Sequence, residues 1–377
     1  MKVALIHDWL TGMRGGENVL EVLCEIFPQA DIFTLLHNPG SVSTVIENRR
    51  IKTSFIQSMP MAKDRYRLYL PLFPLAIEGF DLSGYDLIVS SSHCVAKGVI
   101  PPPGAVHISY IFTPMRYVWD MYPQYFGGKG IKSRAARIFS HYLRMWDTSS
   151  SARVDSFIAI SRHTARRVEK YYRREADVVY PPVDFSRFRI DPAGPEDYYL
   201  IVSAFAPYKR VDMAIEAFNS LGLRLKIIGK GQDEKKLKAM AGPTIEFLGW
   251  KSNDEINAYY SRCKALIFPG EEDFGIVPLE AMSSGRPVIA YGKGGALETV
   301  IPIGGEKAGE APTGIFFMEP NAAALSDAVT ELERSFKRFD PASIRRHALG
   351  FDRAVFKEQI KTAILSKYEE LNKKSGC

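Results

Sequence analysis

Residues 265–290 read ALIFPGEEDFGIVPLEAMSSGRPVIA, and they contain one strand–helix–strand unit. Short apolar runs at Ala265–Phe268 and Pro287–Ala290 are typical of buried strands, and a helix is expected to begin near Val277. Strands that are joined through a helix pair in parallel, because the helix returns the chain to the edge of the sheet from which it left. This unit therefore predicts an α/β protein with a parallel sheet.

The same alternation of strands and helices extends outward in both directions along the chain. The predicted strands are Val3–His7, Asp31–Leu35, Leu87–Ser90, His107–Phe112, Ser156–Ile160, Tyr199–Ser203, Arg224–Ile228, Ile245–Leu248, Ala265–Phe268, Pro287–Ala290 and Ile315–Phe317. Continuous apolar strands that alternate with helices indicate doubly wound sheets with helices on both faces. Residues 181–196 interrupt this pattern with four prolines, and they are predicted to be a linker.

The predicted architecture is α/β, with two Rossmann-like, doubly wound parallel-sheet domains that face each other across a cleft. Residues 1–180 form the first domain and residues 197–350 the second, on either side of the linker. Residues 351–377 are expected to form a helix that crosses back to the first domain. Ligands of such sheets bind beyond the carboxyl ends of the strands, so the cleft is the expected site.

The composition is that of an ordinary globular protein. Hydrophobic residues make up 46% and charged residues 24% of the 377 residues, which excludes disordered, collagen-like and disulfide-stapled chains. No segment has the length and apolarity of a signal peptide or of a membrane-spanning helix. The cysteines, Cys24, Cys94, Cys263 and Cys377, form no C-x-x-C pair. A reduced, metal-free cytoplasmic protein is the expectation.

Two acids in the quoted stretch, Glu272 and Glu280, are separated by seven residues. A helix that begins near Val277 directs its free N–H groups toward the loop that holds Glu272, and it carries Glu280 on its first turn. Carboxylates in such a place can accept hydrogen bonds from sugar hydroxyls. The attraction of acids to a helix N-terminus is an alternative, but it does not account for Phe274 and Gly275 between them.

Two further segments suit a phosphate. Residues 12–17, GMRGGE, follow the first strand and open a helix, whose N-terminal N–H groups can bind an anion; a plain tight turn is the alternative. Lys209 and Arg210 follow the first strand of the second half, where a point charge and a bidentate fork suit a diphosphate. A solvated pair of cations is the alternative there.

Taken together, these motifs resemble the family 4 retaining glycosyltransferases, which have the GT-B fold. The resemblance rests on Gly15-Gly16-Glu17, Lys209, Glu272-x7-Glu280 with Phe274-Gly275, residues 283–290 (SSGRPVIA) and Gly294-Gly295-x-x-Glu298-Thr299. Residues 113–120 (TPMRYVWD) and 207–212 (PYKRVD) are similar to those of bacterial mannosyltransferases of O-antigen and exopolysaccharide assembly. The resemblance covers nearly the whole chain.

The resemblance implies a role for each matching residue. The implied catalytic residues are His93, which would lie beside the reacting sugar, Lys209, which would neutralise the β-phosphate, and Glu272, which would contact the hydroxyls of the transferred sugar. Glu280 would bind the ribose. The remaining implied donor contacts are Gly15, Gly16, Arg210, Gly229, Gly231, Gly249, Trp250, Phe274, Gly275, Ile276 and Val277. Arg116, Tyr117 and Asp120 combine a fork, an aromatic surface and an acceptor, and they are the predicted acceptor-binding residues.

Two positions depart from the family pattern, and both bear on the chemistry. Ala204 stands where the family often has an arginine, and Phe112 where the subfamily commonly has a histidine. With no Asp-x-Asp motif, protein cations rather than a metal ion are expected to neutralise the leaving diphosphate. No carboxylate nucleophile is evident near His93, so departure and attack on the same face of the sugar are favoured over double displacement.

The expected partners are a nucleotide-sugar donor, a lipid-linked or oligosaccharide acceptor and an anionic membrane surface. Residues 129–174 contain 12 Lys and Arg against 3 Asp and Glu, which favours peripheral attachment at the inner face of the cell membrane. Residues 59–80, rich in Tyr, Leu, Phe and Pro, are predicted either to bind a lipid-linked acceptor or to pack in the core. No nucleic-acid partner is predicted, since no recognisable binding module is present.

The predicted function is transfer of mannose from GDP-mannose to a glycan hydroxyl in cell-surface polysaccharide synthesis, with the donor chosen by subfamily likeness. Two alternatives stay open. One is a GT-B enzyme that hydrolyses or epimerises a nucleotide sugar. The other is a catalytically weak partner subunit that binds a nucleotide sugar, for which Ala204 and Phe112 are the arguments.

Overall fold

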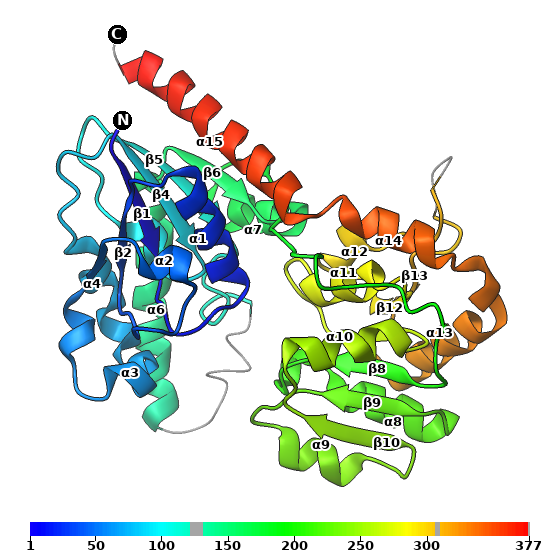
Figure 1. The fold of residues 1–377 in the computed structure, drawn as a ribbon. Coiled ribbons are helices and arrows are strands. Elements are labelled where there is room, and N and C mark those ends of the chain that lie inside the picture. The colour runs from blue at the N-terminus through cyan, green and yellow to red at the C-terminus, as the bar shows by residue number, and fades with distance from the viewer. Residues whose placement is uncertain (121–130, 306–309, 376–377) are drawn as a thin grey trace. The chain divides into compact units, whose positions relative to one another are not determined.

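The computed structural model of the chain describes residues 1–120, 131–305 and 310–375 (Figure 1). The chain divides into two compact units. The N-terminal unit comprises Met1–Pro182 and Ala354–Cys377, and the C-terminal unit comprises Val183–Arg353. Each unit is built around its own sheet, and each is described separately below.

The N-terminal unit contains a seven-stranded sheet in the order β3-β2-β1-β4-β5-β6-β7, in which every neighbouring pair is parallel. The strands are β1 (Val3–His7), β2 (Asp31–Thr34), β3 (Ile51–Thr53), β4 (Leu87–Ser92), β5 (Val106–Ile111), β6 (Ser156–Ala159) and β7 (Ala176–Val178). All side chains of β1, β4 and β5 are buried. Burial of every position is expected for central strands that are covered on both faces.

Helices and short 3-10 turns connect these strands. The α-helices are α1 (Gly15–Ile26), α2 (Thr44–Glu47), α3 (Ala62–Arg65), α4 (Phe73–Glu78), α6 (Ile131–Ser150), α7 (Arg162–Tyr172) and α15 (Arg353–Ser375), and the 3-10 turns are η1 (Phe55–Ser58), η2 (Tyr66–Leu72), η3 (Ala96–Gly98) and η4 (Ser151–Arg153). Helix α1 buries Val19, Leu20 and Leu23, which share one face at a spacing of three and four residues. Helix α7 begins at the Ser161 hydroxyl, which accepts from the Thr164 backbone N–H at 3.0 Å.

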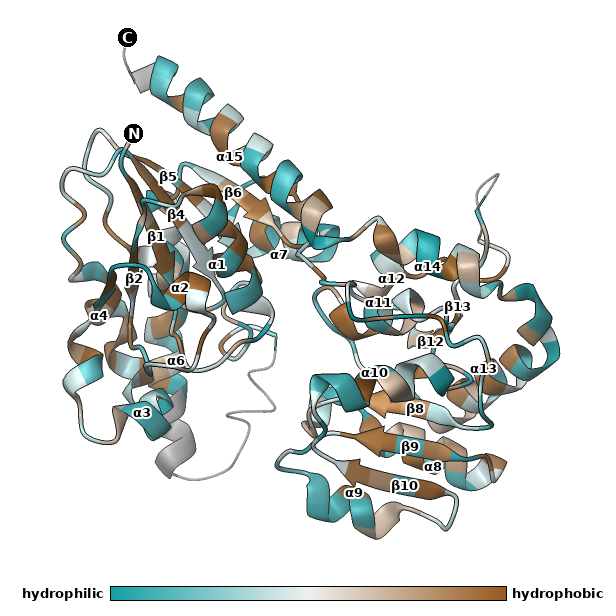
Figure 2. Ribbon diagram, viewed as in Figure 1, coloured by the Kyte–Doolittle hydropathy of each residue, from teal (hydrophilic) through white to brown (hydrophobic). Residues whose placement is uncertain are grey.

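The C-terminal unit contains a six-stranded parallel sheet in the order β10-β9-β8-β11-β12-β13. Its strands are β8 (Tyr199–Val202), β9 (Leu225–Ile228), β10 (Ile245–Gly249), β11 (Leu266–Phe268), β12 (Val288–Tyr291) and β13 (Gly314–Phe317). Its helices are α8 (Val211–Leu221), α9 (Glu234–Met240), α10 (Asn253–Arg262), α11 (Ile276–Ser283), α12 (Ala296–Thr299), α13 (Ala322–Ser335) and α14 (Pro341–Leu349), with the 3-10 turns η5 (Pro207–Lys209) and η6 (Phe336–Arg338). Figure 2 shows β9 and β10 in the colour of hydrophobic residues.

The two sheets confirm the predicted α/β class with doubly wound parallel sheets. Each predicted strand is present, with ends that shift by one or two residues. Strands β3 and β7 were not predicted. Each has three residues and lies at an edge of its sheet, where the side chains are partly exposed and no continuous apolar run marks them.

Residues 183–196, predicted as linker, are part of the C-terminal unit. Val183, Phe185 and Phe188 are buried, and the Arg345 guanidinium donates to the Phe188 carbonyl at 2.9 Å. The prolines prevent regular structure here, but the aromatic side chains between them anchor the segment to this unit.

Helix α15 packs on the N-terminal unit through an apolar stripe. Phe356, Ile360 and Ile364 are buried at a spacing of four residues, and the Phe356 ring lies 5.6 Å from that of Tyr110 on β5. Ion pairs join Lys357 to Glu25 at 2.9 Å and Lys367 to Asp177 at 3.1 Å. The chain thus ends on the unit in which it began.

A buried ion pair ties η3 to α6 in the N-terminal unit. The Lys97 ammonium lies 3.1 Å from an Asp147 carboxylate oxygen, and both side chains are almost inaccessible. Lys97 also donates to the Asp147 carbonyl and to the Ser150 hydroxyl, each at 2.7 Å. Asp147 accepts from Trp119 and Tyr172 at 2.8 and 2.9 Å. An ion pair so deeply buried is costly to break from one side only.

We predict that Lys97→Met lowers the free energy of unfolding by about 3–5 kcal/mol, because it leaves the Asp147 carboxylate buried without its cation. The double variant Lys97→Met, Asp147→Asn should recover a large part of this loss. Urea unfolding followed by circular dichroism measures both effects. The exposed Lys63→Met is the matched control, with a change within about 0.5 kcal/mol. A single variant as stable as this control would contradict the prediction.

Candidate functional site

The predicted glycine turn of the N-terminal unit leaves little space beside it. Gly15 opens α1, and a Cβ atom added to Gly16 would lie 3.4 Å from His7 Cε1 and 3.6 Å from Phe112 Cζ. A larger residue at Gly16 would therefore fill the space beside His7. The turn is held by the Glu17 carboxylate, which accepts from the Arg14 backbone N–H at 3.1 Å. Burial raises the pKa of Glu17 above its usual value.

A buried carboxylate, Asp8, organises the turn that carries His93. Asp8 directly follows β1, and its side chain is fully buried. It accepts from the four consecutive backbone N–H groups of residues 93–96, at 2.7–3.0 Å. The His93 Nδ1 atom lies 3.0 Å from Asp8 Oδ2. Burial alone would raise the pKa of Asp8, but the charge of His93 and its hydrogen bonds outweigh burial and hold the pKa well below its usual value.

This arrangement fixes the imidazole of His93 from one side. Its Nδ1 atom faces Asp8, and the ring of Trp9 lies edge-on at 4.5 Å between centroids. One third of the His93 side chain is exposed. A carboxylate paired with one ring nitrogen of a histidine orients the ring and favours a proton on that nitrogen. Sequence reasoning found His93 but missed Asp8, whose only local signal is an acid that follows a buried strand.

The neighbouring His7 is a second buried imidazole at this place. Its Nδ1 atom lies 2.7 Å from the Ser91 hydroxyl, and its Nε2 atom has no hydrogen-bond partner among the described residues. Burial lowers the pKa of His7 to about 4, against the attraction of Asp8 and with a smaller contribution from His93. His7 is therefore neutral at neutral pH. The sequence analysis assigned it no role.

The three predicted acceptor residues are largely engaged within the protein. The Tyr117 hydroxyl contacts Cys94 Sγ, its ring packs against the core, and burial holds its pKa well above the usual range. Asp120 is bound by the Arg167 guanidinium and the Tyr171 hydroxyl. Arg116 is half-buried in the same turn. These residues are neighbours in the sequence, and Tyr117 does not present its hydroxyl as a free hydrogen-bonding group.

The donor residues predicted in the C-terminal unit follow the carboxyl ends of neighbouring strands. Lys209 and Arg210 follow β8, and Glu272 follows β11, which pairs with β8. The Lys209 ammonium contacts Glu272 Oε1 directly. Arg210 has a φ of 51° and donates to Asp212 Oδ1 and to the Pro320 carbonyl, each at 3.4 Å. The strand pair β8/β11 is where the order of the sheet reverses, the position at which doubly wound sheets bind ligands.

The loop that precedes α11 has a defined backbone. Gly275 has a φ of 98° and forms the N-cap of α11, so Ile276 and Val277 form the first turn of the helix. Phe274 is buried, and a Cβ atom on Gly295 would lie 2.2 Å from the Phe274 Cα atom. Helix α11 begins one residue before the predicted position. Its first N–H groups are oriented as an anion site requires.

Glu280, on α11, is held by two side chains that sequence reasoning missed. Its Oε2 atom accepts from the Tyr260 hydroxyl at 2.8 Å, and its Oε1 atom lies 3.5 Å from the Arg187 guanidinium. Burial raises the pKa of Glu280, and these two partners partly oppose that rise. Arg187 lies within residues 181–196, which were predicted to be a linker and so were assigned no binding role.

The remaining donor glycines shape the loops after β9 and β10. A Cβ atom on Gly229 would lie 1.8 Å from the Ser203 carbonyl, and one on Gly231 would lie 2.5 Å from the Phe205 carbonyl. The loop after β9 thus packs backbone against backbone on the loop after β8, so larger residues at Gly229 and Gly231 are excluded. Gly249 ends β10 with a φ of 69°, and the next residue, Trp250, is 69% exposed. An exposed tryptophan at this edge can stack on a planar base.

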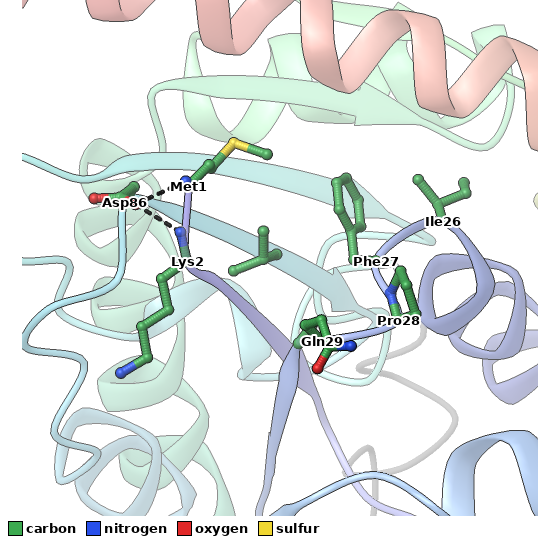
Figure 3. A pocket seen from close by; sticks show the side chains of 9 residues that line it. Met1, Lys2, Ile26, Phe27, Pro28, Gln29 and Asp86 are labelled. Atoms are coloured by element: carbon green, nitrogen blue, oxygen red, sulfur yellow. Dashed lines mark hydrogen bonds and ion pairs between the residues drawn. The ribbon is translucent and has the colours of Figure 1, made fainter.

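A separate pocket lies at the amino ends of the strands in the N-terminal unit. Figure 3 shows that Met1, Lys2, Ile26–Gln29 and Asp86 line it. The Asp86 carboxylate accepts from the backbone N–H of Lys2 at 2.6 Å. It is at the opposite edge of the sheet from Asp8 and His93. None of the predicted site residues lines it.

In the residues that the structure describes, no group of three or more His, Cys, Asp or Glu side chains is placed to hold a metal ion. No described helix has the length and hydropathy that crossing a membrane requires.

Comparison with known proteins shows which proteins the chain resembles. Residues 183–340 match the family model "Glycosyl transferases group 1". An uncharacterized glycosyltransferase of Methanocaldococcus jannaschii is 32% identical over 169 residues, 44% of this chain and 47% of that protein. A GDP-mannose-dependent alpha-(1-6)-phosphatidylinositol monomannoside mannosyltransferase of Mycobacterium tuberculosis is 29% identical over 204 residues, 46% of this chain and 51% of that protein. The chain thus spans about half the length of these relatives.

A solved structure extends the likeness to the whole fold. HepE of Anabaena, solved in complex with UDP, superposes with a TM-score of 0.69 at 16% identity, over 97% of this chain and 100% of that one. The chain therefore has the GT-B fold, and residues 183–340 are similar to the group 1 glycosyl transferases.

Proposed function

We propose that the chain is a retaining glycosyltransferase that moves mannose from GDP-mannose to a hydroxyl of a lipid-linked glycan acceptor. The observation that carries the proposal is the cluster at β8/β11, where Lys209, Glu272 and the N-terminus of α11 lie together. A cation and free helix N–H groups suit a diphosphate, and a carboxylate beside them suits sugar hydroxyls. Few ligands other than a nucleotide sugar combine a diphosphate with sugar hydroxyls.

The donor would lie along the carboxyl edge of the C-terminal sheet. Lys209, with Arg210, would neutralise the diphosphate together with the N–H groups of α11. Glu280, already oriented by Tyr260 and Arg187, would accept from the ribose hydroxyls. The base would lie near Trp250. Fixed cations and dipoles of this kind stabilise the charge that develops on a leaving phosphate without reorganisation during the reaction.

GDP-mannose is the proposed donor because two lines of likeness agree on mannose. Residues 113–120 and 207–212 resemble mannosyltransferases, and the mycobacterial relative is named as GDP-mannose-dependent.

Peripheral attachment to an anionic membrane is proposed from the surface of α6. Ile138, Tyr142 and Met145 form an exposed apolar stripe, beside the basic stripe of Arg137, His141 and Arg144. An apolar face next to cations is typical of helices that bind anionic lipid.

The Asp8–His93 pair is the proposed contribution of the N-terminal unit. The carboxylate would keep a proton on His93 Nδ1, and the other ring nitrogen would then accept from a sugar hydroxyl. We propose same-face departure and attack, in which the leaving phosphate takes the proton of the acceptor hydroxyl. In this mechanism no carboxylate forms a covalent bond to the sugar.

The experiment that tests the function is a thermal-shift screen of GDP-, UDP-, TDP- and ADP-sugars, followed by turnover with a lipid-linked acceptor. We expect the largest rise in melting temperature with GDP-mannose, because a ligand at 100 times its Kd adds about 2.7 kcal/mol to the folded state. GDP release should require the acceptor. Equal release without any acceptor would favour the hydrolase alternative, and a larger shift with another nucleotide would reject the proposed donor.

For Lys209→Ala we predict a loss of turnover of about 100- to 1000-fold, the usual effect of removing one group that stabilises transition-state charge. The variant should still fold, but its melting temperature without donor should fall, because Glu272 loses its cation in a partly buried place. Near-normal turnover of the variant would remove Lys209 from the mechanism.

Wild-type turnover in EDTA should remain within about twofold of that without EDTA, because the proposed mechanism uses no metal ion. Loss of turnover in EDTA with recovery on Mg²⁺ or Mn²⁺ would contradict metal independence.

For the membrane surface, we predict that Arg137→Ser reduces binding to vesicles that contain phosphatidylserine by about fivefold, since one basic residue near an anionic surface contributes about 1 kcal/mol. Vesicle sedimentation at two salt concentrations measures this partition. The matched control is Arg166→Ser on α7, which removes the same charge from another exposed position. An equal effect of both variants would show that net charge, and not the face of α6, mediates binding.

A further inference from the structure

Two residues with different proposed tasks are bound to each other in the free protein. Lys209, proposed to bind the diphosphate, contacts Glu272, proposed to bind the sugar. Their side chains are only 16% and 21% exposed, and the ring of Tyr208 lies 5.2 Å from the Lys209 ammonium. Limited exposure makes such a pair stronger than an ion pair in open solvent.

The backbone on both sides of the pair is fixed by close packing. A Cβ atom on Gly270 would lie 2.7 Å from the Tyr208 carbonyl oxygen and 2.9 Å from Lys209 Cα. The Glu272 carbonyl accepts from the Gly295 N–H at 2.8 Å, and a Cβ atom on Gly294 would lie 2.3 Å from that carbonyl. Gly270 thus allows its loop to approach Lys209 closely, and Gly294 and Gly295 allow close packing on the backbone of Glu272, so the two side chains lie within reach of each other. The pair follows from the fold.

The pair conflicts with simultaneous binding of a phosphate to Lys209. A phosphate oxygen at the ammonium would lie next to the Glu272 carboxylate, and two anions repel at that distance. The carboxylate can move away, but it then loses its partner in a partly buried place, which is unfavourable unless another donor replaces it. The hydroxyls of the transferred sugar are such donors.

We propose that Glu272 competes with the diphosphate for Lys209 and that the sugar of the intact donor compensates the displaced carboxylate. This inference rests on the proposed function. A complete nucleotide sugar satisfies both Lys209 and Glu272, whereas a nucleoside diphosphate satisfies Lys209 alone. The exchange therefore raises selectivity for the donor over the spent nucleotide. Once the sugar has left, Glu272 returns to Lys209 and favours release of the nucleoside diphosphate.

The test measures Kd by calorimetry for GDP and for GDP-mannose, or for the nucleotide pair that gives the largest shift in the thermal screen. Glu272→Gln should bind the nucleoside diphosphate about three- to tenfold more tightly than the wild type, which corresponds to about 0.7–1.4 kcal/mol. Its Kd for the intact nucleotide sugar should not fall. In the Lys209→Met background, adding Glu272→Gln should change the Kd for the diphosphate less than about twofold, because the residue for which they compete is absent.

Glu271→Gln is the matched control, since it removes the same charge from the neighbouring position of the loop. An equal gain in affinity for this control would show a long-range charge effect and overturn the direct exchange. Unchanged or weaker diphosphate binding by Glu272→Gln would also overturn the exchange. The proposed function would stand in that case, provided that the wild type binds a nucleotide sugar. Failure of the wild type to bind any nucleotide sugar would instead reject the function. If Glu272→Gln does not fold, Glu272→Asp withdraws the carboxylate by one methylene, and it too must bind the diphosphate more tightly.

Discussion

Parallel pairing is the constraint on which the rest of this structure depends. When neighbouring strands run in the same direction, their carboxyl ends meet at one edge, and residues far apart in sequence become neighbours. In the N-terminal unit this brings Asp8, after β1, to the turn after β4. In the C-terminal unit it brings Lys209, after β8, to Glu272, after β11. Both strand pairs are the points where the order of the sheet reverses, so the proposed site residues of each unit lie where doubly wound sheets bind ligands.

Asp8 in the N-terminal unit and Glu272 in the C-terminal unit differ in the groups that bind their carboxylates. Asp8 accepts from four backbone N–H groups and faces His93, so it has no capacity left for a ligand. It serves as a fixed anchor, and removing it would leave several buried donors without a partner. Glu272 has a cation on one oxygen and keeps a fifth of its side chain exposed. A carboxylate held mainly by one side chain can change partners, whereas one held by the backbone cannot.

The sequence was most informative where the signal is local. Apolar runs predicted the long strands, and the acids around Phe274 and Gly275 predicted the loop before α11, because both patterns span only a few residues. Asp8 was missed because its partners lie 85–88 positions further along the chain. For Tyr117, the side chain suits either an exposed surface or a core, and only the fold reveals that its hydroxyl meets Cys94. Contacts between distant segments decided both of these features.

The net positive charge of residues 129–174 does not reveal which of its cations are available to a membrane. Several cations of that segment are used inside the N-terminal unit, where Arg153 pairs with Glu78 and Arg167 with Asp120. The net charge therefore overstates what the segment offers to a membrane. What distinguishes α6 is that Arg137 lies beside the exposed side chain of Ile138, with Tyr142 and Met145 following on the same face. An anionic surface attracts any cation, but only a face that also carries exposed apolar groups gains from entering the lipid interface. The proposed membrane attachment therefore depends on the adjacency of two stripes on one helix, and the total charge would contribute only to how the protein approaches the surface.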